Sequence, residues 1–427
     1  MIVIRPIRNN IAVCPECHSE QTITKKVCYP GIHIVAECQC LSCQYEFLQD
    51  LPVGHACYYP ISIGLKDNKV FDSYSIDWYT KQFVQSFKNK EEEHVKVERI
   101  ILKHSEDVIL INCLDYLYGH VLLKLFNISF YKEKNPQKGI IIIVPANFKW
   151  LVPSFVDEIW TVDLKLNEFK KYYSSIDEQI LIFVDSFKSV SLAYTYPHPV
   201  TENIQIEDYS QRKPFDLESF CKKPLTVTYI YRMDRLWHQS KLEYYLFVLL
   251  RKIKILKFCK FLFPGLQNRY IKKLEQQLRK KFPDLVFNVA GIGDTGRFPA
   301  SINDLRSAKP DINREIQWCK VYAESHVVTG IHGSNMLLPT AHSASFIELL
   351  PTDRVGNLTQ DIVTKYTGRT ALFLGRFIQD RSSPAFIADH VESIFKGWKS
   401  FYLYNHSSNQ LFNFDFQNDF IKRLRKH

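Results

Sequence analysis

The amino-acid sequence predicts an α/β protein in which a small zinc ribbon precedes two doubly wound domains. Apolar runs alternate with helical patterns along most of the chain, as in parallel sheets that carry helices on both faces. A stretch with four prolines, residues 196–224, interrupts this alternation, and two C-x2-C pairs lie near the N-terminus. Because the chain has 427 residues, more than one domain is expected.

The first expected element is a zinc ribbon over residues 10–57, which hold seven of the eleven cysteines. Each C-x2-C turn brings two thiolates to one face, and two such turns joined by a hairpin complete a tetrahedral zinc site. The apolar run Gly31–Ala36 suits a strand of that hairpin. Four thiolates leave no open coordination position, so a structural Zn2+ is expected. The expected ligands are Cys14, Cys17, Cys40 and Cys43.

Other cysteines leave alternatives open. Cys38 is an alternative ligand to Cys40, and Cys28 or Cys57 could substitute for another thiolate. A different metal, a redox role or a metal-free fold are further alternatives. The net charge of +10 also allows a ribbon that binds nucleic acid. Residues 12–50 contain only two lysines and no arginine, however, so we expect no nucleic acid as a partner.

The second expected element is an α/β domain over residues 95–215. It follows a charged run at 88–96 that is typical of a solvated helix or linker. Residues 113–127 show a helical pattern, and the stretch at 196–224 is expected to connect this domain to the next. Apolar runs predict strands at Val108–Asn112, Gly139–Val144, Glu158–Val162 and Ile180–Val184.

The third expected element is a second α/β domain over residues 220–384. Helical patterns cover residues 239–281 and 311–325 and begin again at 334. Residues 385–427 are aromatic and basic, and we expect a helical segment that packs back on the first α/β domain. The predicted strands are Leu225–Tyr231, Leu285–Ala290, His326–Thr329 and Ser345–Leu350.

Five of the 15 glycines lie between residues 291 and 333. Gly330 and Gly333 follow a predicted strand and precede a predicted helix, a geometry that offers backbone N–H groups to a phosphate or diphosphate. Glu348, on the next strand, can accept hydrogen bonds from ribose hydroxyls. Residues 291–296 match G-x-G-x-x-G but lack the acidic residue expected about 20 positions later. A turn without a ligand is the alternative at 330–333.

Arg232 and Arg235 come just after the first strand of the second domain, where ligands bind in open parallel sheets. A guanidinium bonds phosphate oxygens bidentately and keeps its charge while a diphosphate leaves. We therefore expect both arginines to contact a diphosphate, with a surface salt bridge as the alternative for each.

The strings VTGIHGSNMLLPTAHSASFIELLP and YRMDR, within residues 224–360, resemble the donor-site motifs of GT-B glycosyltransferases of family 61. The resemblance implies two Rossmann-like domains, with a nucleotide-sugar donor in the C-terminal one and an acceptor in the N-terminal one. Asn335 stands where that family usually has a small apolar residue, so the donor sugar is not carried over. The predicted donor site comprises Arg232, Arg235, Gly330, His332, Gly333, Ser334, Asn335 and Glu348.

Inverting sugar transfer needs a base that deprotonates the acceptor hydroxyl. Asp115 and His120 follow the predicted strand Val108–Asn112 and are the catalytic candidates. Five positions apart on a regular helix, they would point in different directions. His120 is favoured because its ordinary pKa lies near working pH. A helix-capping Asp and a satisfied core His are the alternatives. No D-x-D pair ends a strand, so we expect no metal at the active site.

Residues 244–263 interleave apolar side chains with one arginine and four lysines, a pattern typical of helices on anionic membrane surfaces. A core helix with snorkelling lysines is the alternative. The chain shows no secretory signal and no apolar run of about 18 residues, so a cytoplasmic protein on the inner face of a membrane is expected. The predicted function is sugar transfer to a glycan or lipid-linked acceptor in polysaccharide biosynthesis. A non-catalytic sugar-nucleotide-binding protein is the alternative.

Overall fold

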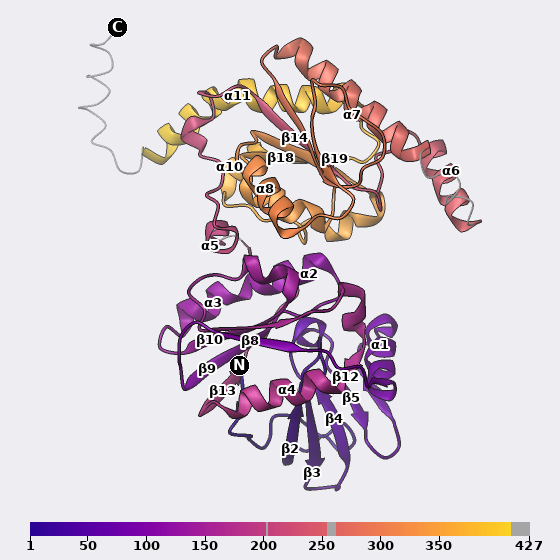
Figure 1. The fold of residues 1–427 in the computed structure, drawn as a ribbon, viewed down its shortest axis with the longest axis vertical. Helices are drawn as coiled ribbons and strands as arrows, with labels where there is room; N and C mark the ends of the chain where they lie inside the picture. Colours follow the sequence, from indigo (N-terminus) through magenta and orange to yellow (C-terminus); the bar gives the residue numbers. More distant parts are fainter. Residues whose placement is uncertain (202–203, 254–261, 411–427) are drawn as a thin grey trace. The chain divides into compact units, whose positions relative to one another are not determined.

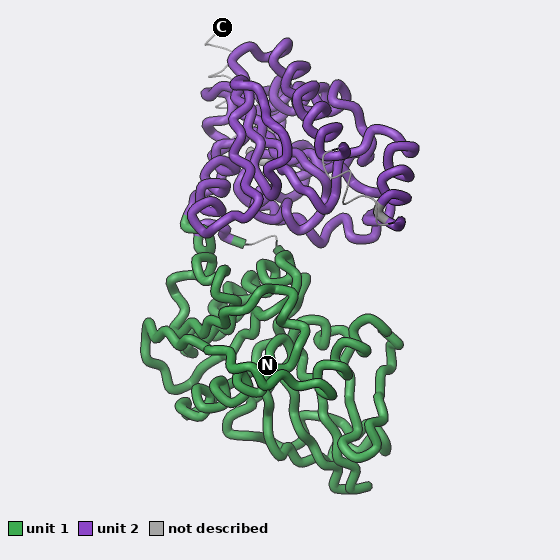
Figure 2. The backbone as a smooth tube through the Cα atoms, turned by 45° about the vertical axis from the view of Figure 1, so that its right-hand side comes forward, with its two compact units in different colours: residues 1–204, 208–211 green, residues 205–207, 212–427 purple. Residues whose placement is uncertain are grey.

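The computed structural model describes residues 1–201, 204–253 and 262–410. The chain divides into two compact units, residues 1–204 with 208–211 and residues 205–207 with 212–427 (Figure 2). The boundary therefore lies within the proline-containing stretch at 196–224. Among the described residues, no helix combines the length and the apolar character that crossing a bilayer requires.

The first unit contains a six-stranded sheet with helices α2 (Tyr118–Leu125), α3 (Asn127–Lys134) and α4 (Ser174–Asp185) (Figure 1). Its four inner strands are parallel and each edge strand is antiparallel to its neighbour. The inner strands are apolar because the sheet is covered on both faces. The strand order is β1 (Ile2–Arg5), β13 (Ser189–Leu192), β9 (Asp107–Asn112), β10 (Gly139–Pro145), β11 (Glu158–Val162) and β8 (Val97–Ile101).

The strand predicted at Ile180–Val184 is wrong, because these residues belong to helix α4. Ile176, Ile180 and Val184 are buried at a spacing of four, whereas Leu181 and Ile182 are exposed. A short apolar run fits a strand and a helix equally well, and here the helical period decides.

A second, antiparallel sheet of five strands forms the N-terminal module of the first unit. Helix α1 (Asp77–Lys88) packs on it through Tyr79 and Phe83. Ile34 and Phe47 of this module share one buried core with Val108 of the parallel sheet, so no boundary separates the predicted ribbon from the α/β domain near residue 95. The strands are β2 (Thr22–Cys28), β3 (Val35–Cys40), β4 (Glu46–Asp50), β5 (Ile61–Gly64) and β6 (Val70–Asp72).

The second unit contains a six-stranded sheet that is parallel throughout. If the six strands of this unit are numbered 1 to 6 along the chain, their order across the sheet is 3-2-1-4-5-6. This is the doubly wound order of Rossmann-like folds. The molecule is thus an α/β protein with two Rossmann-like sheets, as expected. The strand order is β16 (Asn303–Ser307), β15 (Val286–Ile292), β14 (Thr226–Tyr231), β17 (Val327–Ile331), β18 (Ser345–Leu350) and β19 (Gly375–Gln379).

Six helices accompany this sheet in the described part of the second unit (Figure 1). The helical pattern predicted at 239–281 corresponds to α6 and α7, with residues 254–261 outside the described chain. The helices are α6 (Lys241–Lys252), α7 (Leu262–Lys281), α8 (Ile312–Ala323), α9 (Leu337–His342), α10 (Gly368–Leu374) and α11 (Pro384–Gln410).

The C-terminal helix α11 packs on the second unit, against α7 and β18. Ile387, Val391 and Trp398 lie in the same buried core as Val227 of β14. Lys281 of α7 also forms an ion pair of 2.6 Å with Asp389 of α11. The prediction that residues 385–427 pack on the first α/β domain is therefore wrong for the described residues 385–410, because their apolar face covers the second core.

Candidate functional site

The sheet of the second unit has a topological switch point between β14 and β17. Connections run from β14 through β15 to β16 on one side, and from β17 through β18 to β19 on the other. Ligands of such sheets bind outside the carboxyl ends of the strands at this point. Arg232 follows β14 and Gly333 follows β17, so the fold brings the two predicted donor motifs together here.

Arg232 is buried at this point with part of its guanidinium unused. Its Nε and Nη2 donate to the Asp234 carboxylate at 2.8 and 2.5 Å. Its Nη1 is buried and has no hydrogen-bond partner within the described chain. Burial raises the pKa of Asp234, but the hydrogen bond and charge of Arg232 outweigh it and lower that pKa. A buried donor without a partner is costly, and a bound anion would satisfy it.

Gly333 lies directly against the two arginines. Its φ of +144° is in the region that side chains rarely adopt, and a Cβ here would lie 2.7 Å from Nη1 of Arg232 and 2.9 Å from Nη1 of Arg235. Arg235 also donates to the His332 carbonyl at 3.0 Å. Any side chain at position 333 would therefore fill the space beside both guanidinium groups.

His332 and Glu348 form a buried pair beside this turn. The register of β17 and β18 pairs Gly330 with Glu348, which places the His332 ring next to the carboxyl group. His332 Nδ1 is hydrogen-bonded to Glu348 Oε2, and His332 Nε2 lies 3.3 Å from the Asn357 carbonyl. Glu348 Oε1 is buried and makes no hydrogen bond to the described residues.

Both members of this pair have raised pKa values. Burial raises the pKa of Glu348 to about 7, although His332 and Arg232 act in the opposite direction. Burial lowers the pKa of His332, but the hydrogen bond and charge of Glu348 outweigh it, and the result is a raised pKa. The pair therefore holds protons more tightly than separate, solvated side chains would.

The remaining donor candidates lie in or beside the same turn. Gly330 is a buried residue of β17, where a Cβ would lie 3.0 Å from the Ile230 carbonyl oxygen, so its role in the sheet is close packing. Ser334 and Asn335 are half-buried in the single turn at Ser334–Met336 that precedes α9. Because α9 has only six residues, the site depends on the arginines and not on a long helix dipole.

A pocket of about 280 Å³ opens beside Arg235 at the carboxyl ends of the strands. Several polar residues of this pocket were not predicted from the sequence. Asp380 is one of them, because it directly follows β19, and the sequence predicted no strand there. Asp353 and Arg354 follow β18, a position that could have indicated them. The pocket is lined by Asp234, Arg235, Leu236, His238, Tyr244, Phe247, Val248, Ile331, Pro351, Asp353, Arg354 and Asp380.

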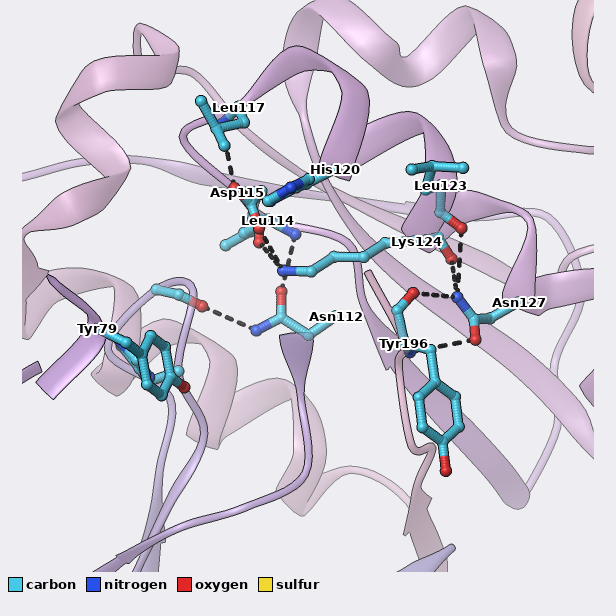
Figure 3. A network of polar contacts seen from close by, with 12 residues as sticks. Tyr79, Asn112, Leu114, Asp115, Leu117, His120, Leu123, Lys124, Asn127 and Tyr196 are labelled. Atoms are coloured by element: carbon cyan, nitrogen blue, oxygen red, sulfur yellow. Dashed lines mark hydrogen bonds and ion pairs between the residues drawn. The ribbon is translucent and has the colours of Figure 1, made fainter. Parts of the chain in front are cut away.

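In the first unit, Asp115, His120 and Lys124 form a polar network after the end of β9 (Figure 3). The Lys124 ammonium lies 2.9 Å from Asp115 Oδ2 and donates to the Leu114 carbonyl at 2.7 Å. His120 Nδ1 lies 3.4 Å from Asp115 Oδ1. Burial raises the pKa of Asp115, but the charge of Lys124 and the His120 contact outweigh it, and the pKa is held well below its usual range.

The prediction that Asp115 and His120 point in different directions is wrong. Helix α2 begins at Tyr118, so Asp115 lies in the preceding turn, where its carboxylate also accepts from the Leu117 N–H at 3.0 Å. Asp115 lies beside His120 without a hydrogen bond to it, because His120 Nδ1 has no hydrogen-bond partner among the described residues. With its oxygens engaged by Lys124 and the Leu117 N–H, Asp115 is not suited to accept a proton itself.

Four cysteines of the N-terminal module form one cluster. Their sulfur atoms lie within 4.8 Å of one another, and this is the single group of at least three possible metal ligands found in the described residues. In both C-x2-C turns a residue with positive φ follows the second cysteine, His18 (59°) and Gln44 (61°). Of the alternatives, Cys57 instead donates to the Pro52 carbonyl at 3.1 Å. The cluster comprises Cys14, Cys17, Cys40 and Cys43.

Comparison with known proteins gives similar solved structures only. An E. coli ADP-heptose lipopolysaccharide heptosyltransferase II is 9% identical, with a TM-score of 0.38, over 68% of this chain and 99% of that one. An E. coli heptosyltransferase solved with ADP is 10% identical, with a TM-score of 0.36 over the same shares. A putative UDP-N-acetylglucosamine 2-epimerase from Listeria monocytogenes is 10% identical, with a TM-score of 0.28. The match covers 69% of this chain and 66% of that one.

No family model and no curated protein matches the sequence. Membership in glycosyltransferase family 61 therefore stays a prediction. The TM-scores of these similar structures all lie below 0.5.

Proposed function

We propose that this protein is a glycosyltransferase of the GT-B type that uses a nucleotide-sugar donor. The observation that carries this proposal is the unpartnered Nη1 of Arg232 beside Gly333 at the switch point. A buried cationic donor next to a turn that excludes side chains fits an anionic ligand such as a diphosphate. Glu348 Oε1 supplies an acceptor for a hydroxyl group of the same ligand.

The donor half of the reaction needs stabilisation of the leaving group. When the bond between the anomeric carbon and the diphosphate breaks, the electron pair leaves with the nucleoside diphosphate. Arg232 and Arg235 would compensate this charge without a metal ion, because guanidinium groups stay protonated. His332 and Glu348 would position the turn that carries Gly333, since they join β17 to β18.

The acceptor half needs a base, for which we propose His120. In an inverting transfer the acceptor oxygen bonds to the anomeric carbon and its proton passes to Nε2 of His120, while Asp115 faces Nδ1. His120→Ala should lower turnover by a factor of about 100 or more and leave nucleotide affinity unchanged. We propose a glycan or lipid-linked acceptor and a role in polysaccharide biosynthesis.

We propose that the cysteine cluster binds one structural Zn2+. Tetrahedral zinc with Zn–S bonds of about 2.3 Å places sulfur atoms about 3.8 Å apart. Cys14 and Cys43 have their sulfurs 3.6 Å apart, and Cys17 and Cys40 theirs 3.5 Å apart, so the residues fit this ion. Zinc bound here would hold the two turns of the module together and would take no part in sugar transfer.

We also propose a peripheral position on the cytoplasmic face of an anionic membrane. Four of the five exposed large apolar side chains on α6 recur at spacings of three and four along one stripe, and the fifth is Tyr244. Lys241 and Lys252 are on the same helix. Such a stripe can enter the headgroup region of a bilayer. The other lysines of this prediction, between residues 254 and 260, lie outside the described chain. The stripe comprises Leu242, Tyr245, Leu246 and Leu249.

Nucleotide binding tests the proposed function most directly. Thermal unfolding with UDP, GDP, CMP and ADP and their sugars should reveal at least one nucleotide that stabilises the wild type. Arg232→Ala and Glu348→Ala should remove that shift, whereas Lys320→Ala, at an exposed position of α8, should keep it. If no nucleotide stabilises the wild type, or if all variants respond equally, the donor site is not where we place it.

A further inference from the structure

The N-terminal module makes direct contact with the network around His120. Val53 forms a β-bridge with Thr195, and the Gly54 N–H donates to the Thr195 carbonyl at 2.8 Å. Gly54 has φ +62°, and a Cβ at this position would lie 3.0 Å from the Lys124 ammonium. The chain therefore brings the short helix at Gly54–Cys57 against the carboxyl end of the first unit's parallel sheet.

This contact places His55 beside the proposed base. The ring centroids of His55 and His120 are 5.0 Å apart, and those of His120 and His198 are 5.3 Å apart. Both ring nitrogens of His55 are buried, and neither has a hydrogen-bond partner in the described parts of the chain. Two buried, unused imidazole nitrogens next to a catalytic candidate indicate a ligand that supplies the missing hydrogen bonds.

An exposed indole adjoins the same ring. Trp78 of α1 contacts His55 edge to face at 4.9 Å and is 51% exposed. Tyr58 and Tyr196 form a further ring pair, 5.9 Å apart, with both rings partly exposed. Aromatic side chains of this kind offer an apolar face together with a polar edge. A sugar ring matches this combination, because it has an apolar C–H face and a rim of hydroxyl groups.

Two other kinds of ligand fit less well. The nitrogens of the three histidines do not meet the distances of a metal site, since the cysteine cluster is the one such group in the described residues. An anion would need a positive charge, but burial lowers the pKa of His55 to about 4, and Lys124 is paired with Asp115. A neutral imidazole both donates to and accepts from hydroxyl groups.

We propose that the N-terminal module completes the acceptor site, with His55 hydrogen-bonding and Trp78 stacking on a sugar residue whose hydroxyl faces His120. That the bound sugar is the acceptor rests on the proposed function. It makes the cysteine-bearing module part of substrate recognition and not only a support of the fold.

Ligand-observed NMR with methyl glycosides tests this site in the full-length protein. We expect saturation transfer to at least one of the methyl glycosides of glucose, galactose, mannose and N-acetylglucosamine. His55→Ala and Trp78→Ala should weaken binding about fivefold to tenfold, while Phe130→Ala, which removes an exposed ring from α3, should leave it unchanged. Trp78 is largely exposed, so its variant keeps the test valid if His55→Ala unfolds the module.

Two outcomes would overturn the inference: no saturation of any methyl glycoside by the wild type, or equal binding by the wild type, His55→Ala and Trp78→Ala. Nucleotide-induced thermal shifts of the same variants separate this result from the donor site. Both variants should retain the wild-type nucleotide response. A missing nucleotide response in the wild type, together with normal glycoside binding, would contradict the proposed function and leave this site in place as a sugar-binding site.

Discussion

Nη1 of Arg232 lies 2.7 Å from the point that a Cβ of residue 333 would occupy. The two residues belong to loops after different strands, and the doubly wound strand order makes those strands neighbours. A side chain at position 333 and a ligand on Arg232 would therefore compete for the same space.

Gly333→Ala should consequently abolish nucleotide binding and destabilise the second unit. The methyl group would displace both guanidinium groups, and φ +144° would add strain of roughly 1–3 kcal/mol. Thermal unfolding with and without the stabilising nucleotide measures both effects. Gly265→Ala is the matched control, because a Cβ there has nothing within 4 Å. A Gly333→Ala protein with wild-type nucleotide response would contradict this arrangement of the site.

Glu348 should make the stability of the second unit depend on pH. Its pKa is raised from 4.5 to about 7, so the folded state binds the proton more tightly than the unfolded state, and stability falls as pH rises from about 4.5 to 7. The raised pKa of His332 acts in the same direction. The loss amounts to roughly 3 kcal/mol.

Glu348→Gln should remove most of this dependence, since an amide does not ionise. Unfolding temperatures at pH 5, 6, 7 and 8 should show the variant gaining roughly 5 °C or more on the wild type as pH rises. The unfolding temperature of Glu92→Gln, a substitution at an exposed position, should change with pH as that of the wild type does. Parallel profiles for Glu348→Gln and the wild type would show that Glu348 is ionised throughout this range.

The zinc assignment predicts about one zinc ion per chain by elemental analysis. Cys14→Ser should lose the metal and unfold the N-terminal module, because the site needs four thiolates. Cys57→Ser is the matched control, since its side chain bonds to a carbonyl and a hydroxyl can replace it. A folded, metal-free wild type would refute the assignment, and zinc loss in Cys57→Ser would point to a different ligand set.

The sequence predicted the strand that precedes Asp115 because its buried positions form an apolar run, as in Val108–Ile111 of β9. It placed Arg232 and Gly333 after other predicted strands, and parallel topology then required both at one edge of the sheet. It could not predict the register that pairs Gly330 with Glu348, because register depends on packing between strands far apart in the chain.

Contacts between residues far apart in the chain could not be predicted from the local sequence pattern. His55 is 65 positions from His120 by residue number, and only the bridge between Val53 and Thr195 brings the module to the network. Helix α4 was predicted as a strand because five apolar residues are too few to reveal a period of 3.6. For α11, the apolar face indicated burial but could not identify which core it covers.

Asp115 should stabilise the first unit because its carboxylate compensates the buried positive charge of Lys124. Asp115→Ala would leave the Lys124 charge buried without its carboxylate, at a cost of about 3–5 kcal/mol. Replacing both residues, as Asp115→Ala with Lys124→Met, should recover most of this loss. Asp77→Ala, which breaks an exposed ion pair with Lys81, should change stability by less than about 1 kcal/mol. Chemical unfolding compares the wild type, Asp115→Ala, Lys124→Met, the double variant and the Asp77→Ala control. Losses that add in the double variant would exclude the coupling.

The exposed stripe on α6 predicts binding to anionic vesicles. Leu246→Asp combined with Leu249→Asp should abolish flotation with phosphatidylglycerol-containing liposomes, because two charges would enter the apolar face of the helix. Leu372→Asp is the matched control, since this leucine is 81% exposed on another helix, α10. Lys252→Gln should weaken flotation most at low salt, where the electrostatic part of the attraction is largest. Unchanged flotation of the double variant would assign any membrane binding to a different surface.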